Sequence, residues 1–333
     1  MKCLTLGKYK HLIAILIISI LFIFPTGLVA TENAAIKKII VIKNSFGSGV
    51  AQVGQKIYED SSLLVPSAIA IDSRSNIFIA DPVNLRIQEY DNRGNYVNSI
   101  KFNIKKEGYG LYIDDITTDG NDNLYVASRH EMKIDKYNSE GKLIQSINLG
   151  DKDIRWRQKE GWVKGSIQIR RIAVDAFGNI YVQGSDELVK FNKQGSLTKR
   201  WTIISRTRSP IFLLDRAGNL YLIKDGKAVE KYDNEGNLLT VNSCGYLASS
   251  MEGAYCYLPV FIDDSGFLYK YKFEDNNNIM ETIKMSNDGK ETDSFRIPLP
   301  LVYTNTVKFS HDGNLYIFDH SGSKFWIEKY KWN

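Results

Sequence analysis

The chain has 333 residues, a formal net charge of +5 and an aromatic content of 12%. Lys2, Lys8 and Lys10 carry three of the positive charges within the first thirty positions, so the rest of the chain is close to neutral. A general nucleic-acid binder normally shows a strong basic excess, which excludes nucleic acid as the expected partner. The nineteen tyrosines suit a β-rich protein, because strands favour aromatic and branched side chains.

Residues 1–30 have the pattern of an export signal. The three lysines form a positive segment, Leu12–Phe24 is an uncharged apolar run, and Ala30 is a small residue at a cleavage position. Extended to Ala30, the run approaches the roughly 20 residues of a membrane span. We therefore expect an exported protein, periplasmic or extracellular, whose folded domain is residues 31–333. An uncleaved anchor at residues 12–30 is the alternative, and the only expected membrane contact.

One phrase recurs along the chain: a turn of Asp-x-x-Gly-Asn type, then Leu or Ile, then an aromatic residue. Its copies are Asp72–Phe78, Asp119–Tyr125, Asp175–Tyr181, Asp215–Tyr221, Asp263–Tyr269 and Ser310–Tyr316. Their spacing is typical of four-stranded propeller blades of roughly 40–50 residues. A second turn follows in most units, at Tyr90–Gly94, Tyr137–Gly141, Phe191–Gly195 and Tyr232–Gly236.

These turns divide each unit into four strands, a to d, joined by tight a–b and c–d turns. Asp or Asn at the first turn position caps the backbone, and Gly adopts the positive φ that the turn requires. The recurring asparagines are too regular to form a functional site, so we interpret them as structural: Asn76, Asn123, Asn179, Asn219 and Asn314.

The first unit resembles the NHL-repeat family. The resemblance rests on Pro66–Asp72, Asn76–Asp81, Asn84 and Arg86–Asp91, although Ala68 and Ser75 stand where the family usually has Gly. It implies an exported, bacterial-type member with short antiparallel sheets packed around an axis. The predicted fold is therefore all-β, a six-bladed β-propeller of four-stranded antiparallel blades. The set Asp81, Asn84 and Arg86 is absent from the other units, so its role is expected to be local to one blade.

The two ends of the chain complement each other. The last unit ends near Tyr330 without a strand d, and an unassigned strand, Ile36–Lys43, precedes the first unit. Pairing them would remove an open sheet edge. We therefore predict that the N-terminal strand closes the last blade.

The d–a and b–c connections share one face, and the large length variation lies there. This face is the expected binding site, because a rigid scaffold presents function on its loops. Its candidate binding residues are Arg155, Trp156, Arg157 and Trp162 in one long loop, with Arg206, Arg208, Tyr112 and Tyr257 in neighbouring loops. Aromatic faces and Arg forks suit a protein or carbohydrate partner. In the alternative interpretation, the two tryptophans merely pack their own loop onto the rim.

The sequence favours a non-catalytic binding or scaffold role without a cofactor. The alternative is a propeller enzyme, a lyase or hydrolase, with a metal or carboxylate site on the same face. His130 and His320 are expected in b–c loops that flank Asp81, and the three are weak metal-ligand candidates. Asp114 and Asp115 start a strand near the central channel, where a structural role is the favoured interpretation.

Two cysteines remain after the leader. Cys244 and Cys256 fall in one d–a loop, which predicts a disulfide in an oxidising compartment. Two free thiols are the alternative.

Overall fold

The computed structural model divides the chain into two compact units, residues 1–35 and 36–333. The residues it describes are 37–59, 61, 63–102, 113–129, 131–150, 157–158, 161–162, 169–184, 187–203, 212–215, 217–224, 228–243, 258–262, 268–274, 279–285, 291–298 and 306–332. All of them belong to the second unit. Within these ranges, no helix is long and apolar enough to cross a membrane.

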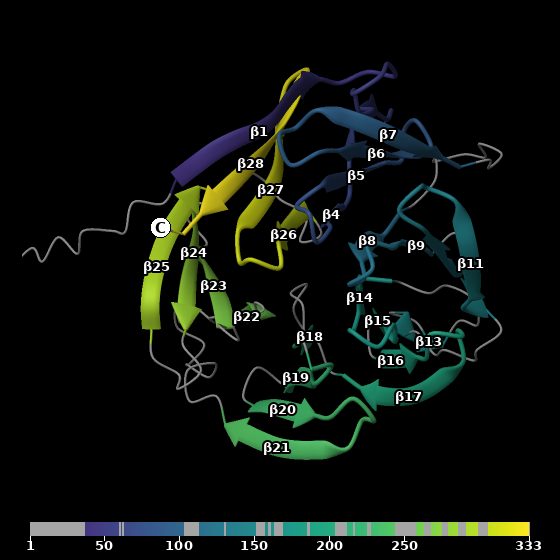
Figure 1. Ribbon diagram of the computed structural model, residues 1–333, viewed down its shortest axis with the longest axis vertical. Coiled ribbons are helices and arrows are strands. Elements are labelled where there is room, and N and C mark those ends of the chain that lie inside the picture. Colours follow the sequence, from purple (N-terminus) through teal and green to yellow (C-terminus); the bar gives the residue numbers. More distant parts are fainter. Residues whose placement is uncertain are drawn as a thin grey trace, which may run out of the picture. The chain divides into compact units, whose positions relative to one another are not determined.

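The second unit is built from six four-stranded antiparallel sheets, which surround a common centre (Figure 1). Blade one consists of β4 (Ile69–Ile71), β5 (Ile77–Asp81), β6 (Arg86–Tyr90) and β7 (Tyr96–Lys101). Blade two consists of β8 (Asp115–Thr118), β9 (Leu124–Ser128), β10 (Lys133–Tyr137) and β11 (Leu143–Asn148). Blade three consists of β14 (Arg171–Val174), β15 (Ile180–Gln183), β16 (Glu187–Phe191) and β17 (Leu197–Thr202). Blade four consists of β18 (Phe212–Leu214), β19 (Leu220–Lys224), β20 (Ala228–Tyr232) and β21 (Leu238–Ser243). Blade five consists of β22 (Leu258–Ile262), β23 (Leu268–Glu274), β24 (Ile279–Met285) and β25 (Glu291–Pro298). The predicted fold class is confirmed.

Blade six is closed by the N-terminal strand. Its order is β1 (Lys37–Ser45), β28 (Lys324–Lys331), β27 (Leu315–Ser321) and β26 (Val307–Phe309). The antiparallel ladder runs from Lys37 opposite Lys331 to Ser45 opposite Lys324, and Figure 1 shows β1 along the outer side of β28. The predicted closure by the N-terminal strand is therefore confirmed.

The a–b turns are held by their own side chains. In blade one, Oδ1 of Asp72 accepts hydrogen bonds from the backbone N–H of Arg74 and Asn76, at 2.9 and 2.7 Å. The side-chain amide of Asn76 donates to Oδ2 at 2.9 Å. The same Asp–Asn pairing recurs between Asp119 and Asn123, Asp175 and Asn179, and Asp215 and Asn219. The repeated asparagines of these turns are therefore structural, as predicted.

In blades two, three and four, the tyrosine of the repeat ties the a–b turn to the sheet. The hydroxyl of Tyr125 donates to Oδ2 of Asp119 at 3.0 Å, and Tyr221 donates to Asp215 at the same distance. A lysine of strand c covers the ring: Nζ of Lys136 lies 4.9 Å from the Tyr125 centroid. Such a cation over an aromatic face is favourable, and it links strands b and c beside the turn.

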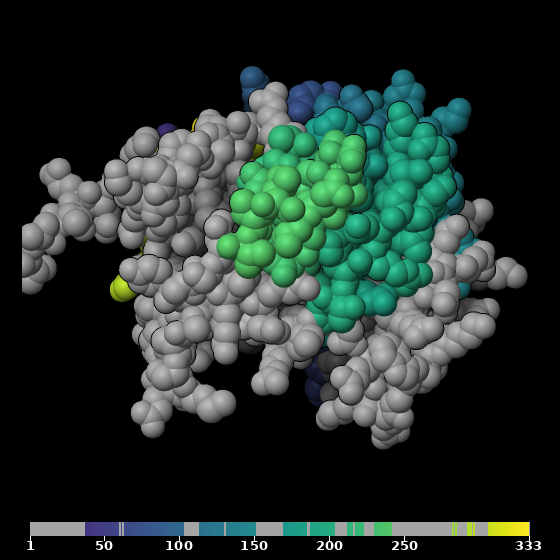
Figure 2. Space-filling model, turned by 90° about the horizontal axis from the view of Figure 1, so that it is seen from below, coloured from purple at the N-terminus to yellow at the C-terminus, as the bar shows by residue number. Residues whose placement is uncertain are grey.

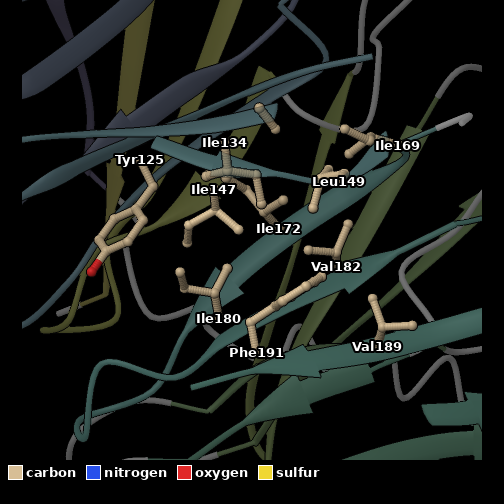
Figure 3. Close-up of a cluster of buried hydrophobic side chains, with 11 residues drawn as sticks. Tyr125, Ile134, Ile147, Leu149, Ile169, Ile172, Ile180, Val182, Val189 and Phe191 are labelled. Atoms are coloured by element: carbon tan, nitrogen blue, oxygen red, sulfur yellow. The ribbon is translucent and has the colours of Figure 1, made fainter. Parts of the chain in front are cut away.

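The core lies between neighbouring blades. Figure 3 shows the cluster that joins blades two and three, in which Ile134 and Ile147 meet Ile172, Ile180 and Phe191, all buried. Burial of such side chains contributes about 1.5–3 kcal/mol each. Blades two and three therefore share one core.

The glycine of the c–d turn sits close to the outer strand of the preceding blade. A Cβ on Gly195 would lie 3.0 Å from Ile147, and one on Gly94 would lie 1.9 Å from the carbonyl oxygen of Val41 in β1. Both glycines also have positive φ. The turn glycine is therefore required twice, by its own backbone and by the adjacent blade.

Candidate functional site

The d–a connections are the long connections of the propeller, because the a–b, b–c and c–d connections are all short. They span residues 46–68, 102–114, 149–170, 203–211, 244–257 and 299–306. In the part of the chain that the structure describes, two of them contain hairpins of their own. These are β2 (Lys56–Ile57) with β3 (Leu63–Leu64), and β12 (Arg157–Gln158) with β13 (Gly161–Trp162). Neither hairpin was predicted from the sequence.

The β12–β13 hairpin brings two predicted binding residues together. Arg157 is the direct antiparallel partner of Trp162, and Gln158 is the partner of Gly161. The other predicted binding residues lie outside the described ranges, as do both cysteines of the predicted disulfide: Arg155, Trp156, Arg206, Arg208, Tyr112, Tyr257, Cys244 and Cys256.

The first d–a connection is anchored to blade one by a buried ion pair. Nε of Arg86 lies 3.0 Å from Oδ2 of Asp81, whose side chain is fully buried. The same carboxylate accepts hydrogen bonds from the backbone N–H of Gly54 at 2.9 Å and the side-chain amide of Asn84 at 2.8 Å. The guanidinium of Arg86 donates in turn to the carbonyl oxygens of residues 49 and 52, at 2.9 and 2.7 Å. The set unique to blade one therefore holds this connection in place, a local role as predicted.

Asn84 and two further side chains of blade one bind the same segment directly. The amide of Asn84 donates to the carbonyl of Gly47 at 2.9 Å, and the amide of Gln88 donates to Gln52 at 2.7 Å. The hydroxyl of Tyr90 donates to the carbonyl of residue 51 at 2.9 Å. Burial raises the pKa of Tyr90, so the phenol stays a hydrogen-bond donor. Side chains of blade one thus satisfy backbone carbonyls of residues 47–52, while backbone hydrogen bonds from Gly47 to Val53 and from Gln52 to Gly49 also hold the segment.

The weak metal-ligand candidates do not form a site among the described residues. Asp81 is engaged by the nitrogen donors of Gly54, Asn84 and Arg86. The prediction that His320 lies in a b–c loop is wrong: it belongs to β27, because the β27–β28 hairpin continues to Ser321. Its ring packs against Phe46 and Phe318, with centroids at 5.9 and 6.3 Å. His130 lies outside the described ranges, within which no group of three or more His, Cys, Asp or Glu could hold a metal ion.

Asp115 joins the inner strands of three blades. Its Oδ1 accepts a hydrogen bond from Nζ of Lys308 in β26, and its Oδ2 accepts one from the backbone N–H of Ile172 in β14, both at 2.9 Å. Asp115 is fully buried, whereas Lys308 is partly exposed. Burial lowers the pKa of Lys308, and the neighbouring Asp115 carboxylate opposes that shift. This carboxylate is a structural clamp between blades two, three and six.

Asp114 is engaged separately. It accepts a hydrogen bond from the backbone N–H of Arg129 at 2.6 Å, and Nε of Arg129 lies 3.1 Å from its other oxygen. Burial raises the pKa of Asp114 to about 7, even though the Arg129 charge acts in the opposite direction. Both carboxylates therefore have the structural contacts that the favoured interpretation expected.

Six four-stranded antiparallel sheets, with the last closed by the N-terminal strand, make this protein a six-bladed β-propeller. Solved structures of the same kind include a catalytically inactive variant of virginiamycin B lyase from Staphylococcus aureus with quinupristin, at 11% identity and a TM-score of 0.52. That match covers 89% of this chain and 99% of the other. A member of the duf4221 family from Bacteroides vulgatus matches at 13% identity and a TM-score of 0.51, covering 90% and 99%.

No family model matches the sequence, and no curated protein matches it either. At these low identities, the likeness to solved structures shows the fold alone. A shared propeller does not transfer an activity, since one fold hosts many functions.

Proposed function

We propose that this chain is an extracytoplasmic propeller of NHL type that binds a protein or glycan partner through its d–a and b–c connections, without catalysis. One observation carries the proposal: the two ends of the blades are built differently. The a–b and c–d turns are short and satisfy their own polar groups, whereas the d–a connections are long and two of them form hairpins. Long connections on a rigid scaffold are where propellers place recognition.

The β12–β13 hairpin is the leading contact element in this proposal. It pairs Arg157 with Trp162, residue types that are enriched where proteins bind partners. An Arg fork binds a carboxylate, and an indole stacks on a sugar or a peptide. The export pattern of residues 1–30 supports a partner outside the cytoplasm, and the predicted disulfide between Cys244 and Cys256 fits such a compartment.

No comparable structural observation among the described residues supports the alternative that the protein is an enzyme. Asp81, Asp114 and Asp115, the carboxylates considered for catalysis, all hold backbone or cationic groups of the propeller itself. A catalytic role would require them to give up contacts that join separate parts of the fold.

The test is a binding comparison between two matched surface variants. The purified protein would be screened on an array of acidic and neutral oligosaccharides and, by chemical cross-linking, in the exported fraction of the source cells. Changing Arg155, Arg157 and Trp162 together to Ala should weaken binding of any hit at least tenfold. The control changes Arg93, Lys142 and Phe177, exposed residues of the opposite turns, to Ala.

The control variant should bind like the unchanged protein. Equal affinity of all three proteins for every hit would remove the β12–β13 hairpin from the site. Loss of binding in the control alone would move the site to the face of the tight turns.

A further inference from the structure

Apolar side chains are exposed where three outer strands leave their c–d turns. Each of these strands begins directly after its turn with two large apolar residues, which are between 36% and 53% exposed. The pairs are Tyr96 and Val97 in β7, Leu143 and Ile144 in β11, and Leu238 and Leu239 in β21. Figure 2 shows the green residues of blade four at the surface of the molecule.

An a–b turn adds an aromatic ring at the same end of the blades. Phe177 in the a–b turn of blade three is 53% exposed, and in an antiparallel blade the a–b and c–d turns share one end. Of the eleven large apolar residues that are exposed in the described part of the chain, seven lie in a tight turn or within two residues of one. Single apolar residues on a surface are ordinary, whereas recurring pairs mark a contact surface. We call the end of the blades that carries these seven residues the tight-turn face.

The chain enters the propeller on this same face. Lys37 starts β1 opposite Lys331, the last residue of β28. This end of β28 lies at the a–b turn of blade six, because the indole of Trp332 donates to the carbonyl oxygen of Gly313 at 3.0 Å. Since β1 takes the place of strand d in its blade, Lys37 lies where the apolar pairs lie in the other blades.

The sequence before Lys37 points to the occupant of the tight-turn face. Only residues 31–36 separate Lys37 from the uncharged segment 12–30, whose length approaches that of a membrane span. Six residues span at most about 20–22 Å when fully extended, which is less than half of the width of about 50 Å expected for a compact unit of this size. An anchor in residues 12–30 would therefore hold the tight-turn face close to the lipid.

We propose that residues 12–30 remain in the membrane as an anchor and that the tight-turn face lies on the lipid surface, with its apolar side chains among the lipid headgroups. Tyr and Lys are typical residues of a membrane interface, and Tyr96 and the exposed Lys37 fit that position. Because the anchor raises the effective concentration of lipid at this face, weak apolar contacts suffice to keep it there. The d–a connections lie at the opposite end of the blades, so the contact does not rest on the binding function proposed for them.

Lipid photo-cross-linking of the full chain tests the proposal. The protein would be reconstituted in phosphatidylcholine vesicles that contain a lipid with a diazirine near its headgroup, and cross-linked peptides would be identified by mass spectrometry. Peptides that contain residues 143–144 or 238–239 should carry lipid at least about fivefold more often than the peptide with Val50 and Ile57. Those two residues are 72% and 69% exposed in the first d–a connection, so exposure alone would favour them. Equal labelling of the two peptide groups, or no lipid on residues 37–332, overturns the proposal.

Two matched variants, checked for folding by circular dichroism, sharpen the test. Ile144→Glu with Leu239→Glu should lower lipid labelling of the tight-turn face at least about fivefold, because it removes apolar contacts and adds charge. The control, Val50→Glu with Ile57→Glu, should be labelled like the unchanged protein. Equal labelling of the two variants overturns the proposal, and so does a membrane-bound protein that begins after Ala30, since it would have no anchor. Chemical cross-links from Lys142 to a second copy, with no lipid on this face, would also overturn it.

Discussion

The c–d turn of blade one and the d–a connection that enters the same blade are held in opposite ways. In the turn, Asp91 accepts hydrogen bonds from the backbone N–H of Arg93 and Asn95 and from the Asn95 side chain. Every partner lies within four residues. The connection at residues 46–54 is held by Asp81, Arg86 and other side chains that come about thirty or more residues later.

The comparison distinguishes segments that are ordered by their own residues from segments that are ordered by distant parts of the fold. A turn whose donors and acceptors are close in sequence forms its contacts wherever the chain is placed, so it can repeat in every blade. A connection held by another element is ordered only after that element has folded. Substitutions of the polar side chains in the turns should therefore have small, local effects, and substitutions in the anchor of the connection should affect ring closure.

Removing the closing strand should have the largest effect. Deletion of residues 31–45 takes away β1, exposes β28 as an open edge and removes Ile42 from the core at the blade six–blade one boundary. The expected result is a fall in the melting temperature of at least about 10 °C, or loss of folding. Circular dichroism during heating measures it, and an unchanged melting temperature would show that the ring does not need this strand.

Substitution of Asp81 should come second. Asp81→Asn leaves the buried guanidinium of Arg86 without its anion, which typically costs about 3–5 kcal/mol of the free energy of unfolding. Asp91→Asn in the exposed c–d turn is the matched control and should cost much less, because its hydrogen bonds are exposed to solvent. Urea unfolding of both variants measures the difference. Equal costs would refute the distinction between the two kinds of connection.

A comparison of two turn glycines measures how much the contact between blades six and one limits the space at the turn. Gly94 and Gly178 both have positive φ, so Ala at either position is strained by about 1 kcal/mol or more. An added Cβ at Gly178 meets only Lys193 at 3.4 Å, whereas at Gly94 it meets the Val41 carbonyl oxygen at 1.9 Å. Gly94→Ala should therefore be less stable than Gly178→Ala by about 2 kcal/mol or more. Similar stabilities in urea would mean that β1 does not press on this turn.

The effect of Asp114 should be visible only as a pH dependence of the stability. Burial raises its pKa to about 7, so the folded state holds a proton that the unfolded state releases near pH 4. The stability from this group is complete below pH 4 and is lost as pH rises from about 4 to 7. In Asp114→Asn, the free energy of unfolding should fall less between pH 5 and 8. An identical slope in the unchanged protein would contradict the raised pKa.

The repeated turns and the ring closure could be read directly from the sequence. The Asp and Asn residues recur at fixed spacing because each pair makes the same local hydrogen bonds, as Asp72 and Asn76 show. The ring closure could be inferred because the last blade lacks a strand d of its own, and its open edge needs a partner strand. The candidate site was predicted less completely. The β2–β3 and β12–β13 hairpins lack a strong turn motif, and the strand position of His320 depends on how far the β27–β28 ladder extends.

The amino-acid sequence by itself determined the six-fold repeat, its tight turns and the strand that completes the ring, since these depend on contacts within a few residues or on simple strand counting. Only the tertiary structure decided what Asp81, Arg86 and Asp115 do. Their partners come from distant segments, residues 49–54 for the first two and Ile172 and Lys308 for the third. Hydrogen bonds of that kind leave no periodic signal, because the partners become neighbours only when the blades pack around their common centre.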